Sequence, residues 1–350
     1  MADGNALEPA HEFESGIELN RRFYNEVVRP IVTQPHSAGL LGYGSQVLGY
    51  DTARSMDHGW GLRATVFVAE ADVATTRNAI DASLPQNFGG HPTRYGWDDW
   101  PVRHHVDVMT LSQWLRDHLG FDATNAVTDL DWIATPQQKL LEVVRGAVYH
   151  DGLNALERVR ANLSWYPDDV WRWLLACQWR RISQEEPFVG RTAEVDDDLG
   201  SRLLTGRLVG ELMNLHFLYA RTYRPYSKWF GTAYAALDGA DELQPVWDAA
   251  LAADNVADRE RALCSGYESL ARVHNRTGLT EVMEETVRPF YNRPFLVIDA
   301  NRFADALFAS VDDPWLRAQP PIGSIDQFVD STDVLGHTDV ATRYRAVFTP

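Results

Sequence analysis

A glycine-serine pair followed by a spaced aspartate is the part of this sequence best suited to chemistry. Gly44-Ser45 precedes Asp57, and an apolar, β-prone run from Leu62 to Ala69 follows the aspartate. A glycine lets the backbone approach phosphate oxygens, and a serine hydroxyl can donate a hydrogen bond to them. An aspartate at the edge of a sheet supplies a hard oxygen ligand for magnesium. The spacing therefore predicts a turn that holds phosphates beside a metal site.

The position two residues after Asp57 decides how complete this metal site is. Side chains two apart on a strand share a face, so carboxylates at positions 57 and 59 would bind one metal cluster. This chain has Gly59 there, which removes one ligand. His58 cannot replace it, because its side chain would point to the opposite face.

Two other aspartates could complete the site. Asp107 lies in a segment from His105 to Leu111 that alternates with period two and predicts a strand. If this strand neighbours the one that begins near Asp57, the two carboxylates converge. Asp51, in the loop between Ser45 and Asp57, could approach as well. Two or three oxygens suffice for a magnesium ion that also binds water and substrate phosphates. The alternative is that Asp57 caps a turn and Asp107 faces solvent.

Three charged residues in the second half of the chain are further candidates. Glu185 and Glu186 end a tryptophan-rich helical pattern, and a helix-borne glutamate facing the phosphate site could be the general base for an acceptor hydroxyl. Lys228 opens another helical pattern and could contact a phosphate. The alternatives are an exposed, charged helix end and a surface lysine. We expect Lys228 and at least one of these glutamates to face Gly44-Ser45 across a domain interface.

The elements that must position these residues predict an α+β chain with two domains. Residues 1–135 would form a small mixed-sheet domain, with strands over 38–43, 62–69 and 105–111 and helices over 16–33, 72–84 and 112–119. Residues 136–350 would form a helical bundle domain, in which 295–298 is an ambiguous strand and the tail from residue 314 is loop-like. The helices expected in this second domain cover 137–149, 153–163, 167–185, 199–222, 228–237, 243–253, 256–277 and 281–287.

Composition narrows the classes of partner. The 350 residues carry a formal net charge of −17, which argues against nucleic acid and anionic membranes and is compatible with a cationic small molecule. No run approaches the length of a membrane span, and the first residues contain no apolar signal core. The two cysteines form neither a disulfide framework nor a zinc site, so a cytoplasmic location is expected. The oligomeric state is not determined by the sequence.

Several strings together resemble one bacterial family. They are Gly44-Ser45, Leu48 to Asp51, Ser55 to Gly61, Tyr166 to Trp171, Pro225 to Gly231 and Gly323 to Phe328. The chain thereby resembles the domain of unknown function 4037 proteins of the minimal nucleotidyltransferase superfamily, from about residue 16 to 335. The family is similar in layout to kanamycin-type aminoglycoside nucleotidyltransferases, in which a mixed sheet precedes a helical bundle and the acceptor lies between them. The family string reads Asp-His-Asp-Trp-Gly, and this chain departs from it at Gly59.

The resemblance implies a nucleotidyltransferase. Such a protein moves a nucleoside monophosphate from magnesium-bound NTP, with ATP the expected nucleotide, to a hydroxyl or amine of a small molecule. Gly44, Ser45 and Lys228 would contact the phosphates, Asp57 and Asp107 would hold Mg²⁺, and Glu185 or Glu186 would be the acceptor's base. The alternative is a regulatory protein that binds nucleotide or another ligand but has lost turnover with the carboxylate at position 59. A third interpretation is a structural helical scaffold.

Overall fold

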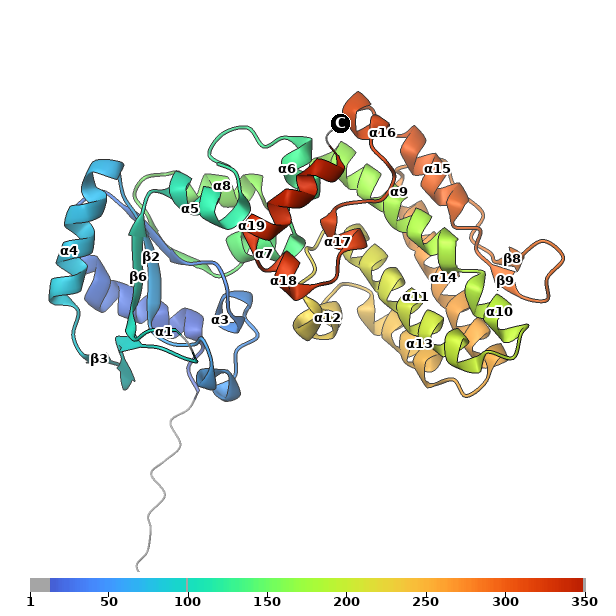
Figure 1. Ribbon diagram of the computed structural model, residues 1–350, viewed down its shortest axis with the longest axis horizontal. Helices are drawn as coiled ribbons and strands as arrows, with labels where there is room; N and C mark the ends of the chain where they lie inside the picture. The colour runs from blue at the N-terminus through green and yellow to red at the C-terminus, as the bar shows by residue number, and fades with distance from the viewer. Residues whose placement is uncertain (1–12, 99, 349–350) are drawn as a thin grey trace, which may run out of the picture. The chain divides into compact units, whose positions relative to one another are not determined.

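The protein is described by a computed structural model that covers residues 13–98 and 100–348. It is mixed α/β, with one small mixed sheet and many helices (Figure 1), which confirms that part of the predicted fold. Two compact units are present: unit 1 comprises Met1–Asn125 and Glu142–Leu163, and unit 2 comprises Ala126–Leu141 and Ser164–Pro350. Where the sequence placed one boundary after residue 135, the chain crosses between the units three times.

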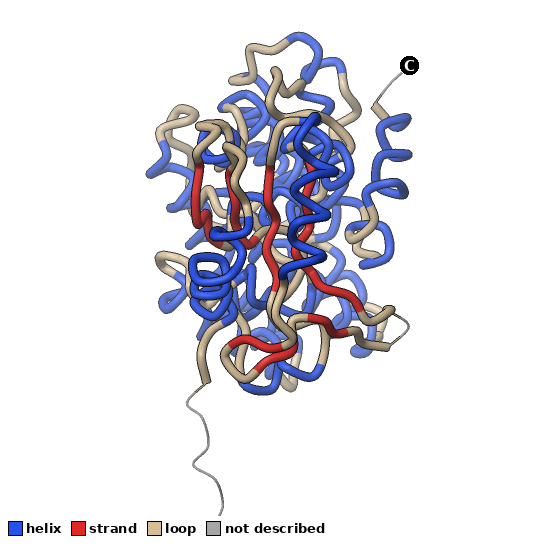
Figure 2. The backbone as a smooth tube through the Cα atoms, turned by 90° about the vertical axis from the view of Figure 1, so that its left-hand side faces the viewer, coloured by secondary structure: helices blue, strands red, loops and turns tan. Residues whose placement is uncertain are grey.

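Unit 1 is built on a five-stranded sheet with the order β5-β6-β2-β1-β7 (Figure 2, strands in red). β1 (Ser37–Leu40) lies antiparallel to β2 (Arg63–Phe67) and to β7 (Ala147–Asp151). β6 (Arg103–Met109) is parallel to β2 and antiparallel to β5 (Arg94–Tyr95). The three strands expected in this domain therefore exist, and the strands expected over 62–69 and 105–111 are neighbours.

The register of β2 against β6 determines which side chains share a face. Arg63 pairs with His105 and Thr65 pairs with Asp107. Since alternate residues of a strand point to the same side, these four side chains lie on one face of the sheet. The intervening Ala64, Val66, Val106 and Val108 are buried on the other face, in a core with residues of α1 (Gly16–Phe23) and α4 (Val73–Ser83).

Local signals explain how the helices of unit 1 begin and end. Ser15 caps α1 by accepting a hydrogen bond from the Glu18 amide, and Thr110 does the same for Gln113 at the start of α5 (Leu111–Leu119). α5 ends at Gly120, which has a φ of +86°, as the sequence predicts. The remaining elements of unit 1 are η1 (Tyr24–Val28), α2 (Arg29–Ile31), α3 (Ser45–Leu48), η2 (Ala53–Asp57), η3 (Glu70–Asp72), β3 (Asn87–Phe88), β4 (His91–Pro92) and α8 (Leu156–Asn162).

Unit 2 is a bundle whose long helices are α9 (Asp168–Glu185), α11 (Asp198–Tyr219) and α14 (Val256–Thr277) (Figure 1). α9 packs on α11, and Trp173 and Trp179 of α9 are fully buried. α7 (Gln137–Val144) begins in unit 2 and ends in unit 1. The other elements of unit 2 are α6 (Asp129–Ala134), α10 (Phe188–Ala193), α12 (Ser227–Tyr234), α13 (Ala240–Ala252), β8 (Arg288–Pro289), β9 (Leu296–Val297), α15 (Asn301–Ala309), α16 (Pro314–Ala318), α17 (Ile325–Phe328), α18 (Thr332–Leu335), α19 (Thr338–Ala341) and η4 (Thr342–Val347).

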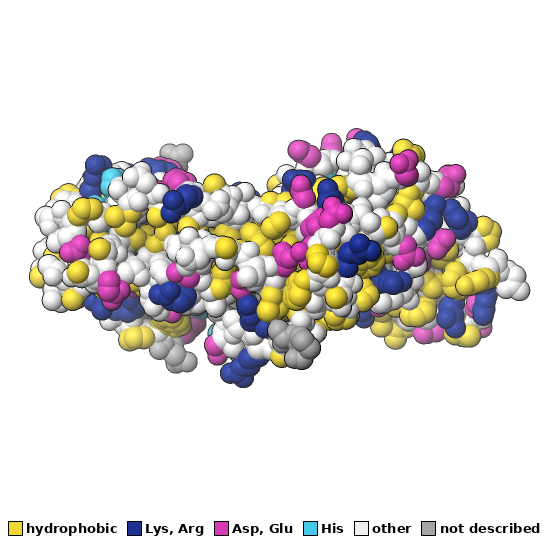
Figure 3. Space-filling model, turned by 90° about the horizontal axis from the view of Figure 1, so that it is seen from above, with side chains coloured by type: hydrophobic (Ala, Val, Ile, Leu, Met, Phe, Trp, Pro, Cys, Tyr) yellow, Lys and Arg dark blue, Asp and Glu magenta, His cyan; other side chains and the backbone are white. Residues whose placement is uncertain are grey.

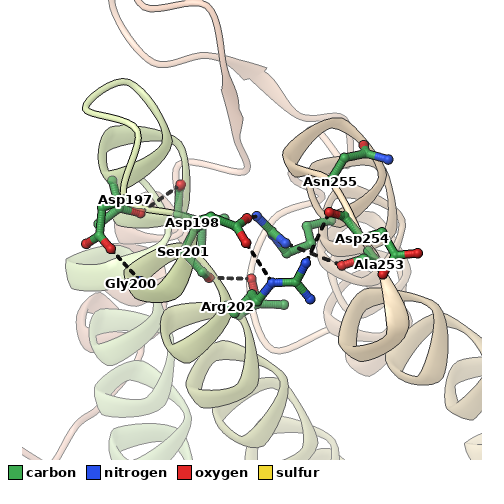
Figure 4. A network of polar contacts seen from close by, with 12 residues as sticks. Asp197, Asp198, Gly200, Ser201, Arg202, Ala253, Asp254 and Asn255 are labelled. Carbon is green, nitrogen blue, oxygen red and sulfur yellow. Dashed lines mark hydrogen bonds and ion pairs between the residues drawn. The ribbon is translucent and has the colours of Figure 1, made fainter.

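A buried arginine connects the start of α14 to the start of α11. Arg259 of α14 is 1% exposed, donates to the Ala253 carbonyl oxygen at 3.3 Å and forms an ion pair with Asp198. Arg202 bonds the same aspartate at 2.8 Å and also donates to the Asp254 carbonyl oxygen at 3.1 Å (Figure 4). The start of α11 is thereby connected to the segment between α13 and α14.

Three expectations about local structure were wrong. The helix expected over 137–149 ends at Val144, and Ala147–Asp151 forms β7 instead. Gly146 separates the two with a φ of +72°, at a place where a Cβ would collide with the Leu40 carbonyl oxygen. Residues 281–287 are not helical, because the Asn275 side chain holds both the amide and the carbonyl of Met283. The tail contains the short helices α16 to α19 rather than only loop.

The surface and the helices also bear on possible partners. Within the described ranges, no helix is both long and apolar enough to cross a bilayer. On the face drawn in Figure 3, basic and acidic side chains lie among one another. The excess of acidic residues is therefore not gathered into one block on that face.

Candidate functional site

The turn predicted to hold phosphates lies directly after β1. Gly42 and Gly44 have φ angles of +86° and +108°, which side chains with a Cβ rarely adopt. The Gly42 amide donates to the Glu142 carbonyl oxygen at 2.9 Å, and the Gly44 carbonyl oxygen accepts from the Val47 amide at 3.1 Å. Ser45 begins α3 immediately afterwards. The glycines are therefore required by the backbone of this turn, as the sequence pattern indicates.

An arginine that the sequence reasoning missed supports this turn. Arg63 is only 7% exposed, and its Nη2 donates to the carbonyl oxygens of Leu41 and Tyr43, both at 2.8 Å. Its guanidinium carbon lies 4.4 Å from the centre of the Tyr43 ring. Its Nη1 is buried without a hydrogen-bond partner and lies 3.5 Å from the position that a Cβ would take at Gly44. The signal in the sequence was a charged residue within an otherwise apolar strand pattern.

Polar side chains stabilise the backbone around Arg63. Asn20, which is fully buried, accepts from the Arg63 amide at 2.6 Å and donates to the carbonyl oxygens of Gly16 and Gly61. Asp51 accepts from the Gly16 amide at 2.7 Å and from Trp60 Nε1 at 2.9 Å, both on the same oxygen. Asp51 therefore has a structural role, because this oxygen links the start of α1 to the segment before β2.

The expected geometry of Asp57 and Gly59 was wrong. Asp57 ends the 3-10 helix η2 and is exposed, whereas β2 begins only at Arg63. Gly59 lies in the intervening turn with a φ of +63°, and a Cβ there would face the Trp97 ring at 3.8 Å. Strand alternation therefore does not place residues 57 and 59 on a common face.

Asp107 lies on β6 and is paired in register with Thr65 of β2, as expected for neighbouring strands. Its side chain is 44% exposed and forms an ion pair with Arg103 at 3.0 Å. In the part of the chain that the structure describes, no group of three or more His, Cys, Asp or Glu side chains is placed to hold a metal. Asp107 thus has Arg103 as its ionic partner and Asp57 lies on an exposed turn, and that the two hold Mg²⁺ stays a prediction.

An exposed aromatic group borders the turn. We define it as Tyr43, Trp97 and Trp100. Tyr43 and Trp100 are 44% and 50% exposed, and the rings of Trp97 and Trp100 stack with centroids 5.3 Å apart and an interplanar angle of 15°. Trp97 also lies 6.4 Å from the Tyr43 ring and 5.2 Å from the His105 ring. The sequence patterns did not reveal this group, since both tryptophans lie between the helix expected over 72–84 and the strand expected over 105–111.

Burial keeps the imidazole beside this group neutral. His105 is 3% exposed, and one of its ring nitrogens contacts the Tyr95 carbonyl oxygen at 3.0 Å. Desolvation lowers the pKa of His105, partly opposed by that backbone contact. Arg63 is therefore the buried cation on this side of the sheet, next to an uncharged histidine.

Glu186 has a structural role in unit 2, because backbone amides occupy both oxygens that a general base would need. It is 6% exposed, and its two carboxylate oxygens accept from the amides of Ile298 at 2.8 Å and Ala300 at 2.9 Å. Both oxygens therefore hold the segment that leads into α15. Desolvation raises the pKa of Glu186 to about 7, against the opposing effect of these amides.

Glu185 and Lys228 lie elsewhere in unit 2. Glu185 pairs with Arg207 at 2.8 Å, and its Oε2 is buried without a partner. Burial raises the pKa of Glu185, while Arg207 opposes the shift. Lys228 is exposed at the start of α12, with its ammonium 5.0 Å from the centre of the Trp229 ring. That these residues face the Gly44-Ser45 turn stays a prediction.

Strings far apart in the sequence meet at a buried polar cluster in unit 2. Asp326 accepts from the Gln137 amide at 2.9 Å, and its own carbonyl oxygen accepts from Arg224 at 2.8 Å. The Arg224 amide donates to Gln137 Oε1 at 3.0 Å, and the Tyr226 amide donates to Gln138 Oε1 at 3.1 Å. The strings 225–231 and 323–328 are therefore joined through the start of α7.

Residues 132–230 match a family model described as Domain of unknown function (DUF4037). The DUF4037 region contains Glu185, Glu186 and Lys228, and it covers the strings 166–171 and 225–230. Gly44, Asp57 and Asp107 precede the DUF4037 region. Comparisons with curated proteins and with solved structures gave no match.

The buried Glu186 of the DUF4037 region predicts a pH dependence of stability. Its pKa of about 7 lies above its ordinary value of 4.5, so the folded state binds this proton more tightly than the unfolded chain. Its contribution to stability is full below about pH 4.5 and is lost as the pH rises through about 7. We expect a loss of about 1–3 kcal/mol across this interval. Urea unfolding at a series of pH values measures it.

The matched variant is Glu186→Gln. Glutamine offers one acceptor to two amides, so this variant should be less stable at low pH, but its stability should vary less between pH 4.5 and 7. Parallel pH profiles for the two proteins would show that Glu186 does not titrate in this range.

Proposed function

We propose that unit 1 binds a nucleoside triphosphate, with the phosphates at the Gly42–Ser45 turn and the base on the aromatic group. The observation that carries this proposal is the buried Arg63 guanidinium, which has a free N–H nitrogen directed at Gly44. Guanidinium groups and exposed backbone at glycines are common partners of phosphate oxygens. The resemblance to nucleotidyltransferases supports the same assignment.

The aromatic group supports a nucleotide over a simple phosphate. Tyr43 is both part of the turn and a ring in contact with Arg63, so a ligand on Arg63 would lie beside exposed aromatic surface. Aromatic side chains stack on nucleobases, at about 1–3 kcal/mol per base. Stacking on Trp97 or Trp100 is tolerant of base identity, so these rings alone do not select one nucleotide.

A second candidate is transfer of the nucleoside monophosphate to a small-molecule hydroxyl or amine. The acceptor oxygen or nitrogen would bond to the α-phosphorus, pyrophosphate would leave, and the acceptor proton would pass to a base. Asp107 favours this candidate, because a half-exposed carboxylate lies on the same sheet face as Arg63. Without turnover, the protein would bind nucleotide in a regulatory role.

Binding is tested by thermal unfolding of the full chain with each of the four NTPs. A nucleotide at about 100 times its Kd stabilises the folded state by about 2.7 kcal/mol, and the melting temperature should rise by about 4–9 °C. Trp97→Ala should weaken binding about 5- to 100-fold. The matched control is Tyr291→Ala, which removes an 85% exposed aromatic ring of unit 2 and should leave binding unchanged. The absence of a shift with all four NTPs would contradict the proposal.

Turnover is tested by pyrophosphate release in the presence of candidate hydroxyl and amine acceptors. Release by the wild type that falls in Asp107→Asn supports the transferase candidate. Nucleotide binding without release supports the regulatory one.

A further inference from the structure

We infer that Arg63 supplies the positive charge for the bound phosphates, so that nucleotide binds to unit 1 without a metal ion. This inference rests on the proposed function and names how its site recognises the ligand. Gly59 stands where a second carboxylate ligand for magnesium was expected. A cation, Arg63, already contacts the turn through the carbonyl oxygens of Leu41 and Tyr43.

The guanidinium of Arg63 is positioned for an anion. Its Nη2 is held by two carbonyl oxygens, those of Leu41 and Tyr43, and its backbone amide is held by Asn20. All three partners are neutral. None of the ion pairs between described residues includes Arg63. The charge is therefore fixed in orientation but is not neutralised by a carboxylate of the chain.

One nitrogen of the Arg63 guanidinium has no partner. Nη1 is buried, has no hydrogen-bond partner and lies 3.5 Å from the Cβ position at Gly44. A buried cation without an anionic partner is costly, and a buried donor without an acceptor adds to that cost. Bracing the turn needs only Nη2. An oxyanion above Gly44 would satisfy both the charge and the remaining donor, as arginine commonly does with phosphate.

The carboxylates on this side of unit 1 do not compete for that role. Asp107 is paired with Arg103 at 3.0 Å, and Asp57 is exposed on η2. At position 59, where a second metal ligand was expected, the glycine faces the Trp97 ring. The cation closest to the turn is thus a side chain of the protein, and a phosphate there does not need a metal to bridge it to carboxylates.

The decisive measurement uses the wild-type full chain. Isothermal titration calorimetry would give the Kd of each NTP and of inorganic tripolyphosphate in excess EDTA and in excess magnesium. We expect binding in EDTA, with a Kd that differs from the value in magnesium by less than about tenfold. Because no substitution is involved, this result does not depend on whether a variant folds.

Three variants then assign the effect to one side chain. Arg63→Met should weaken tripolyphosphate binding in EDTA at least about tenfold, and Arg63→Lys should recover part of the loss, since a lysine keeps the charge without the guanidinium fork. The matched control is Arg103→Met, which removes a 42% exposed arginine from the same face and should change Kd less than about threefold. Circular dichroism confirms that each variant is folded.

Each outcome is informative. Binding of both probes that EDTA abolishes and magnesium restores would overturn the inference and leave the proposed function standing. Tripolyphosphate binding in EDTA with no binding of any NTP would support the anion site and contradict the nucleotide. No binding of either probe in either buffer would overturn both. Equal losses in Arg63→Met and Arg103→Met would replace a specific Arg63 site with a general charge effect, against the inference.

Discussion

Replacing Arg259 with alanine is expected to destabilise unit 2 by about 2–5 kcal/mol, chiefly through the cavity that it leaves. The guanidinium is 1% exposed, pairs with Asp198 and donates to the Ala253 carbonyl oxygen at 3.3 Å. Its removal leaves a cavity between α11 and the start of α14 and deprives that carbonyl of its donor. Urea unfolding of the full chain, followed by far-UV circular dichroism, measures the change in the free energy of unfolding.

Arg202→Ala is the matched control, because Arg202 bonds the same aspartate from the surface. Surface ion pairs contribute little, so the control should unfold close to the wild type. Arg259→Met restores most of the lost volume without the charge and should be less damaging than alanine. If the alanine variants at positions 202 and 259 unfold alike, the buried arginine does not stabilise the helix junction.

Replacing Asp326 with alanine is expected to cost about 3–5 kcal/mol as well. Its Oδ2 accepts from the Gln137 amide at 2.9 Å, and Oδ1 lies 3.8 Å from the Arg224 guanidinium. Without the carboxylate, a buried amide and a largely buried arginine both lose a partner. Burial raises the pKa of Asp326, and Arg224 opposes that shift, so the charged form depends on this arginine. The free energy of unfolding is again the measured quantity.

Asp326→Asn separates the hydrogen bond from the charge. Asparagine still accepts from the Gln137 amide, so we expect a smaller loss, of about 1–2 kcal/mol. The surface control is Asp333→Ala in α18, which should unfold close to the wild type. If Asp326→Ala unfolds like Asp333→Ala, the cluster does not hold α17 on unit 2.

Elements with strong local signals could be predicted from the sequence. The helix over 256–277 has the predicted bounds, because Asn255 caps its start and Gly278, with a φ of +65°, ends it. β2 follows the apolar, β-prone run of its sequence, and β6 follows its period-two alternation. β7 could not be predicted in this way, since its conformation depends on pairing with β1, more than a hundred residues earlier in the chain. Its residues continue an apolar pattern that favours a helix when it is considered alone.

The candidate site was only partly predictable for the same reason. The Gly44-Ser45 turn depends on residues adjacent in sequence, and its position followed from them. The free nitrogen of Arg63 depends on which atoms lie around it after folding, and no sequence pattern records that. Glu186 had the residue type and helix position of a base, but the backbone at 298–300 occupies both its oxygens.

Because the chain passes between the units three times, the sheet of unit 1 cannot be completed until part of unit 2 has been synthesised. β1 pairs with β2 early in synthesis, but its other edge has no partner until Ala147–Asp151 emerges. Part of unit 2, Ala126–Leu141, is therefore translated before the first sheet can be finished. Nascent chains pass through a stage with an open strand edge, where aggregation and chaperone capture compete with folding. A fragment that ends at residue 135 lacks β7, so we expect its sheet to keep an unpaired β1 edge and to be prone to aggregation.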